Sequence, residues 1–94
     1  MSLDEIEQRL ISILQRHGAR NIALFGSYAR GDARPESDMD VLVKFDSRKS
    51  LLSLVSIERE LSESIGIKVD LLTEKAVSPY LIDCIRSEAR VIYQ

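Results

Sequence analysis

The first part of the chain carries apolar residues at helical spacing. Side chains three and four positions apart share one face of an α-helix, and this rule is followed by Leu3, Ile6, Leu10, Ile13 and Leu14. Ser2 and Glu5 have the spacing of a capping box, which satisfies free amides at a helix start. His17 and Gly18 are typical of a helix end. The pattern predicts an amphipathic first helix.

Two later segments repeat this pattern. A long helix is expected between Ser50 and Gly66, with an inner face made of Leu51, Leu54, Ile57, Leu61 and Ile65. A last helix should start at Ser78-Pro79, a cap followed by a first-turn proline. Its expected inner face consists of Leu81, Ile82, Ile85 and Ala89. Residues 27–31 have room for one or two further turns.

Four segments are typical of strands. The clearest spans residues 38–45, where Met39, Val41, Val43 and Phe45 alternate with residues of the opposite face. The others cover residues 21–25, 67–72 and 91–93. Helices and strands therefore alternate along the chain. This order predicts an α/β (α+β) fold, in which helices cover a small mixed β-sheet.

Composition limits the class of protein. A length of 94 residues suits one domain, and 45% hydrophobic with 30% charged residues is ordinary for a folded chain. The net charge of −2 argues against direct nucleic-acid binding, which needs a basic face. A nucleotide held by a metal and backbone amides remains compatible with this charge.

The single cysteine, Cys84, excludes an internal disulfide and favours a reducing compartment. Its place in an apolar helical pattern predicts a buried structural thiol rather than a reactive one. The sequence has no apolar run of membrane length, and its first residues are acidic where a signal peptide would be basic. We therefore expect a cytoplasmic protein.

Three aspartates fall on the predicted strands. Asp38 and Asp40 are two positions apart, so their side chains should point the same way, about 6 to 7 Å apart. Asp70 lies on the next strand and faces away from its apolar neighbours. A buried charge is costly without a partner, and oxygen ligands favour Mg²⁺ or Mn²⁺. Each aspartate alone is more simply a loop or surface residue, but together they predict a site for two divalent ions.

A glycine-serine turn precedes the aspartates. Gly26 and Ser27 connect a strand to a short helix, where backbone amides and a hydroxyl can bind phosphate oxygens. The pair alone would be only a strand exit, and it lacks the lysine of a Walker loop. Arg30 and Arg34 flank the turn. Arg30 is equally well explained as a ligand of a triphosphate or as a surface residue, whereas Arg34 is better explained as a surface residue.

The motif formed by Gly26-Ser27, ten further residues and Asp38-Met39-Asp40 resembles the signature of the DNA polymerase β nucleotidyltransferase superfamily. The strings 25–32 and 37–43 are similar to its minimal nucleotidyltransferase (MNT) branch. The resemblance extends over essentially the whole chain. It implies a polymerase β-like nucleotidyltransferase core formed by residues 1–94 as one domain.

The resemblance also implies roles for individual residues. Gly26 and Ser27 would contact nucleotide phosphates, and Asp38 and Asp40 would be ligands of both metals. Asp70 fits the family's third carboxylate, which holds the catalytic metal and helps to deprotonate the acceptor. The implied reaction is attack of an acceptor hydroxyl on the α-phosphorus of a nucleoside triphosphate, with release of pyrophosphate.

The acceptor is expected to come from another protein. MNT proteins are often encoded beside a HEPN-domain toxin, and the resemblance implies an antitoxin that transfers AMP from ATP to a tyrosine of the HEPN RNase. The chain ends soon after its last strand, which leaves a partner or a second copy to supply the acceptor. Two alternatives stay open: nucleotidyl transfer to a small molecule, and a non-catalytic antitoxin that only binds its partner.

Overall fold

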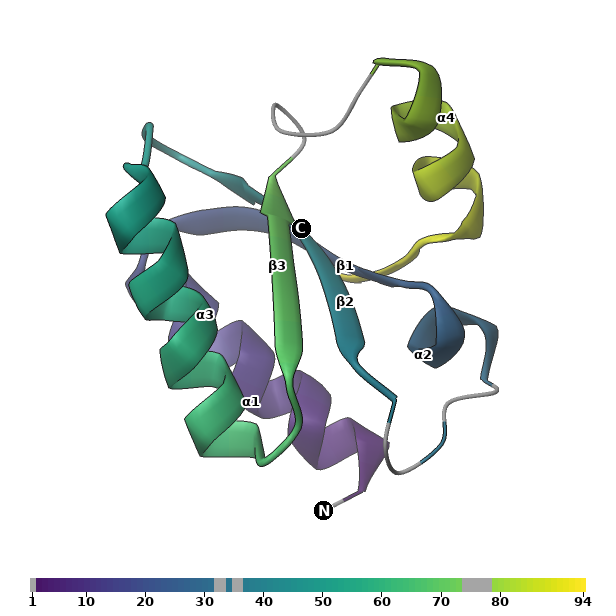
Figure 1. The fold of residues 1–94 in the computed structure, drawn as a ribbon, viewed down its shortest axis with the longest axis horizontal. Coiled ribbons are helices and arrows are strands. Elements are labelled where there is room, and N and C mark those ends of the chain that lie inside the picture. Colours follow the sequence, from purple (N-terminus) through teal and green to yellow (C-terminus); the bar gives the residue numbers. More distant parts are fainter. Residues whose placement is uncertain (1, 32–33, 35–36, 74–78) are drawn as a thin grey trace.

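The computed structural model describes residues 2–31, 34, 37–73 and 79–94. Its helices are α1 (Leu3–Arg16), α2 (Ser27–Arg30), α3 (Leu51–Ile65) and α4 (Pro79–Glu88). Its strands are β1 (Ala19–Phe25), β2 (Met39–Phe45), β3 (Val69–Thr73) and β4 (Arg90–Tyr93). The predicted α/β (α+β) order of elements is confirmed (Figure 1). None of the helices in these ranges has the length and apolar character needed to span a bilayer.

The strands form one mixed sheet in the order β3-β2-β1-β4. β1 pairs antiparallel with both β2 and β4, whereas β2 and β3 run parallel. The parallel strands β2 and β3 are joined through α3, because a crossover connection is needed to return the chain to the end of the sheet where β2 begins. Figure 1 shows α1 and α3 beside each other and α4 well apart from them.

The main core lies between one sheet face and the helices α1 and α3. It combines two helical stripes with alternate residues of three strands, as the periodicity predicted. Its completely buried side chains include Leu10, Leu14, Ile22, Leu24, Met39, Val41 and Leu61. Side-chain caps begin both covering helices. At the start of α1, Ser2 accepts a hydrogen bond from the Glu5 amide, and at the start of α3, Ser50 accepts one from the Ser53 amide.

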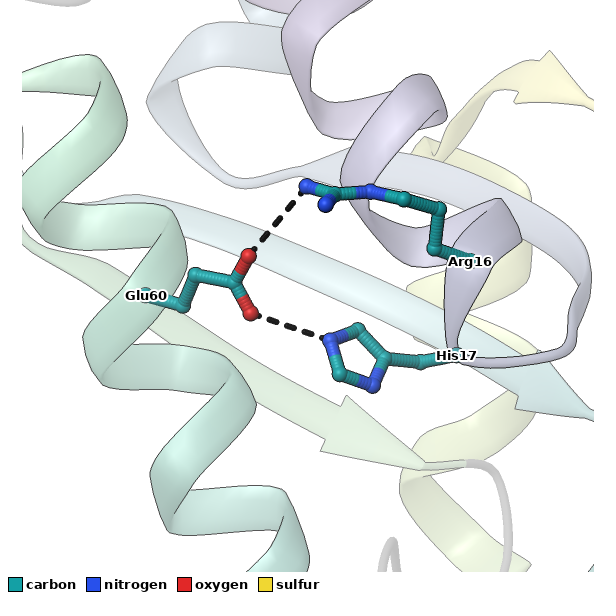
Figure 2. Close-up of polar contacts among 3 residues, drawn as sticks. All are labelled: Arg16, His17 and Glu60. Atoms are coloured by element: carbon teal, nitrogen blue, oxygen red, sulfur yellow. Dashed lines mark hydrogen bonds and ion pairs between the residues drawn. The ribbon is translucent and has the colours of Figure 1, made fainter.

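Glu60 links the two covering helices. Its carboxylate accepts a hydrogen bond from Arg16 at 3.3 Å and lies 3.0 Å from His17 Nε2, so α3 is joined to the end of α1 (Figure 2). These side chains are partly exposed, which keeps the energetic contribution of each pair small. The contacts therefore set the relative position of the helices more than the stability of the core.

Helix α4 differs from its prediction. Cys84 is exposed rather than buried, and Leu81 of the expected inner face is 56% exposed. Leu51, expected on the inner face of α3, is 76% exposed. The reason is that the main core is formed by α1, α3 and the sheet, and no described residue of α4 enters it. The predicted cap Ser78 and much of the loop before β2 lie outside the described residues.

Replacing the completely buried Leu61 with alanine should lower the free energy of unfolding by about 2 to 5 kcal/mol, because the change leaves a cavity between α3 and the sheet. Denaturant unfolding would measure the loss. Leu52→Ala is the control, since Leu52 lies on the same helix and is 82% exposed. Its expected effect is within about 0.5 kcal/mol. Equal losses in both variants would contradict the assignment of the core.

Candidate active site

Asp40 and Asp70 lie directly beside each other on the sheet. They are partners in the parallel register of β2 and β3. Their chain neighbours Met39, Val41 and Val69 are buried in the core, so the two aspartates project from the opposite sheet face. Both side chains are half-buried. The pairing expected from the sequence between these two carboxylates is therefore present.

The Gly26 turn packs against the same carboxylate. Phe25, the last residue of β1, is the register partner of Asp40, and Gly26 follows it at φ +73°. A Cβ atom at position 26 would come within 2.5 Å of an Asp40 carboxylate oxygen. Glycine thus allows the turn to approach the carboxylate, and Ser27 begins α2 immediately afterwards. The structure places Gly26, Ser27 and Asp40 together.

Asp38 occupies a different position from the one expected. The predicted strand began at Asp38, but β2 begins at Met39, so Asp38 precedes the strand and is not fixed by its alternation. Its carboxylate is 46% exposed and lies 3.8 Å from the ammonium group of Lys68. The Met39 amide donates to the Lys68 carbonyl at 2.8 Å, and this bond marks the start of the parallel pairing. Asp38 is therefore close enough to act on Asp40, but its position is not set by the strand.

Electrostatics connects these residues. Partial burial raises the pKa of Asp40 above its ordinary value, and the negative charges of Asp70 and Asp38 raise it further. Arg30, on α2, acts in the opposite direction and lowers the pKa of Asp40. The ionised site thus stores repulsion that a bound cation would relieve. Arg30 thus places a positive charge near the aspartates, as a ligand of a triphosphate would.

The donor set fits a hard divalent cation. Asp40 and Asp70 offer only oxygen ligands, and the missing Cβ of Gly26 leaves space at the Asp40 carboxylate. Within residues 2–31, 34, 37–73 and 79–94, no three acidic, histidine or cysteine side chains stand close enough to form a metal centre. The structure brings two of the three predicted ligands together. Convergence of all three on metal ions stays a prediction.

Two residues of α3 support the site and were not identified from the sequence. β3 is an edge strand, so the amides flanking Asp70 point away from β2. The Leu71 amide donates to the Glu58 carboxylate at 2.8 Å, and the Val69 amide donates to the Ser62 hydroxyl at 3.0 Å. These bonds protect the sheet edge and hold the backbone on both sides of Asp70. The four-residue spacing of Glu58 and Ser62 is informative only once the strand beneath α3 is known.

Comparison with known proteins decides the family. The family model described as "Nucleotidyltransferase domain" matches residues 3–92. The chain belongs to this family. It is accordingly an enzyme of the nucleotidyltransferase class.

Individual relatives agree with this assignment. A Methanocaldococcus jannaschii protein, named provisionally as a protein adenylyltransferase, is 45% identical over 95% of this chain and 96% of its own length. A solved structure, named provisionally as a minimal nucleotidyltransferase, is 35% identical with a TM-score of 0.81 and covers 96% of this chain and 95% of its own. The two are similar to this protein from end to end, which confirms the predicted MNT resemblance.

The fold is also shared with a toxin–antitoxin complex. The complex contains a tri-AMPylated HEPN toxin from Shewanella oneidensis and an MNT antitoxin. The matched chain is 20% identical, with a TM-score of 0.79 over 96% of this chain and 71% of that one. At this identity the likeness establishes a common architecture.

The Asp40 carboxylate should make stability depend on pH. Because its pKa is raised in the folded state, the folded protein holds this proton more tightly than the unfolded chain, and the free energy of unfolding falls as pH rises from about 3.8 through the raised value. Asp40→Asn removes this loss, so the variant should gain stability relative to wild type as pH rises to 7 in EDTA. Thermal unfolding across the pH range would measure the difference. Asp83→Asn, on α4, reports the general effect of removing one negative charge; the same pH trend there would contradict the site effect.

Gly26→Ala should be more damaging than a glycine replacement elsewhere. Gly66 is the matched control because it also has positive φ, +80°, but a Cβ there meets nothing within 4 Å. Gly66→Ala should cost about 1 to 2 kcal/mol of folding stability from backbone strain alone. Gly26→Ala adds a clash with the Asp40 carboxylate and should additionally weaken ATP binding, measured by calorimetry with Mg²⁺. Equal losses in stability and unchanged ATP binding would contradict the close approach of the turn to Asp40.

Proposed function

We propose that this protein is a metal-dependent protein adenylyltransferase that transfers AMP from ATP to a tyrosine of a HEPN-type toxin and acts as its antitoxin. The single observation that carries the proposal is the side-by-side register of Asp40 and Asp70, with the Gly26 turn packed against the first of them. Membership of the nucleotidyltransferase family supplies the reaction class. We place the reaction in the cytoplasm, because ATP is available there and a single cysteine stays reduced there.

The residues of the site have separate tasks in this proposal. The tyrosine oxygen forms a new bond to the α-phosphorus, the bond from that phosphorus to the β-phosphate oxygen breaks, and pyrophosphate leaves. Asp70 accepts the phenolic proton. Gly26 and Ser27 bind the departing phosphates through the backbone and the hydroxyl, and Arg30 adds positive charge. Two Mg²⁺ ions, held by Asp38, Asp40 and Asp70, would neutralise charge on the attacking and leaving oxygens.

Asp38 must change partner for this site to close. Its carboxylate lies 3.8 Å from the Lys68 ammonium group and is 46% exposed, so its present position is not fixed by packing in the core. A divalent cation attracts it more strongly than an exposed ammonium group does, because surface ion pairs contribute little. In this proposal Asp40 and Asp70 keep their register, and Asp38 completes the metal ligands by leaving Lys68.

The partner proposal is supported by relatives rather than by this chain alone. The M. jannaschii relative carries the name of a protein adenylyltransferase, and the shared fold occurs in an antitoxin bound to an AMPylated HEPN toxin. Transfer to a protein therefore agrees with both better than transfer to a small molecule does.

The test is label transfer in the complex with a HEPN-type protein encoded beside this one. ATP labelled at the α-phosphate should label the partner in the presence of Mg²⁺, whereas ATP labelled at the γ-phosphate should not. Asp40→Asn should lower the initial rate by at least about 100-fold, since it removes a metal ligand and leaves the fold intact. Mass spectrometry would locate the added AMP on a tyrosine.

Two results would contradict the proposal in different ways. Tight inhibition of the toxin without label would make this protein a binding antitoxin. Label on the partner that survives Asp40→Asn would place the chemistry at another site. Arg59→Gln is a suitable control, because Arg59 is an exposed α3 residue paired with Glu63, and α3 covers the sheet face opposite the aspartates.

A further inference from the structure

Two side chains of α3 bond to the backbone of β3 on both sides of Asp70. The Glu58 carboxylate accepts a hydrogen bond from the Leu71 amide at 2.8 Å, and the Ser62 hydroxyl accepts one from the Val69 amide at 3.0 Å. The Ser62 hydroxyl also donates to the Glu58 carbonyl at 3.0 Å, which connects the two residues to each other. Glu58 and Ser62 together are named the α3 clamp, and Asp70 lies between the two amides that they bind.

The α3 clamp extends from a helix that the core holds in place. Glu58 follows Ile57 and Ser62 follows Leu61, and these two neighbours are 3% and 0% exposed. Both clamp side chains are themselves half-buried. Close packing around the two neighbours restricts the helix backbone that carries the clamp. The clamp therefore ties the backbone around Asp70 to the main core.

Strand β3 needs this restraint because it lies at the edge of the sheet. Among the described strands its neighbour is β2, and the pairing of these two strands sets Asp70 beside Asp40. The two negative carboxylates repel each other, which contributes to the raised pKa of Asp40. This repulsion acts to separate the carboxylates until a cation binds them. The hydrogen bonds on the outer side of β3 limit that displacement.

The segment of β3 that the clamp holds also meets Asp38. The Lys68 carbonyl accepts a hydrogen bond from the Met39 amide at 2.8 Å, and the Lys68 ammonium group lies 3.8 Å from the Asp38 carboxylate. Displacement of residues 68–71 would therefore change the surroundings of Asp38 as well as the position of Asp70.

Apolar packing leaves the clamp a task separate from folding. Val69 and Leu71 are 1% and 9% exposed, so their side chains already hold β3 on the core. Loss of one clamp bond should leave the strand folded and give the Asp70 backbone more freedom. Resting on the transferase activity proposed above, we infer that Glu58 and Ser62 are positioning residues, which hold the Asp70 carboxylate where it binds the same divalent cation as Asp40.

The first test needs neither a metal nor the reaction. In Glu58→Ala the Leu71 amide loses its acceptor, so its hydrogen exchange in EDTA should become about 10-fold faster, the usual effect of losing one hydrogen bond. The Val41 amide, on β2, reports general opening of the sheet and should accelerate less. NMR would measure both rates. Equal acceleration of the two amides would reduce the clamp to a contribution to overall stability and overturn the inference.

The second test measures metal binding by the isolated protein. Mn²⁺ alone, followed by the electron paramagnetic resonance signal of the free ion, should bind Glu58→Ala and Ser62→Ala about 10- to 100-fold more weakly than wild type. Glu63→Ala and Ser56→Ala are the matched controls on α3, because both side chains are exposed, and they should bind Mn²⁺ as wild type does. Each titration is made below the melting temperature of the variant. Unweakened binding by both clamp variants would overturn the inference.

Glu58→Gln separates the hydrogen bond from the charge. The glutamine keeps an oxygen that can accept from the Leu71 amide but lacks the negative charge, so it should restore much of the Mn²⁺ affinity that Glu58→Ala loses. If Glu58→Gln binds Mn²⁺ as weakly as Glu58→Ala, the charge of Glu58 acts on the cation directly, and the positioning role is wrong.

The outcomes also separate this inference from the function on which it rests. In the transfer reaction both clamp variants should lower kcat by about 10- to 100-fold with an unchanged KM for the acceptor protein, since Asp70 acts on the metal. A raised KM with an unchanged kcat would overturn the clamp role. A wild-type protein that binds no Mn²⁺ and labels no acceptor would overturn the proposed function together with the inference. Wild-type binding and transfer that both clamp variants retain in full would overturn the inference alone.

Discussion

The parallel pairing of β2 with β3 is the constraint on which the candidate site depends. It sets Asp40 beside Asp70 and buries Val41 and Leu71 on the reverse face. Because side chains alternate along a strand, a slip of one residue would turn Asp70 into the core and expose Val69 or Leu71. The hydrophobic core therefore enforces the register, and the register in turn positions the carboxylates.

Helix α3 serves this pairing in two ways. It forms the crossover that parallel strands require, and its Glu58 and Ser62 side chains accept hydrogen bonds from the free edge of β3. The bonded amides belong to the residues on either side of Asp70. Strand edges are the least constrained parts of a sheet, so this support keeps an edge-strand carboxylate in register with a central-strand one.

The site itself opposes stability. Asp40 is partly buried beside two other carboxylates, and Arg30 partly offsets their effect on its pKa. Such repulsion between carboxylates is typical of functional clusters. It lowers the stability of the folded chain, and a bound cation would remove it. The main core on the other face is apolar and closely packed. The sheet thus separates a stabilising face from a reactive one.

The sequence by itself determined the order of elements, the apolar faces of α1 and β2, and the motif that joins Gly26-Ser27 to the aspartates, because these depend on local periodicity and capping. Tertiary structure alone decided which faces are covered. Periodicity grouped Leu81 with an inner face, yet α4 stands outside the main core and leaves Leu81 and Cys84 exposed. Pairing also displaced Asp38 from the strand and revealed Glu58 and Ser62. These features join residues distant in sequence, so no local pattern encodes them.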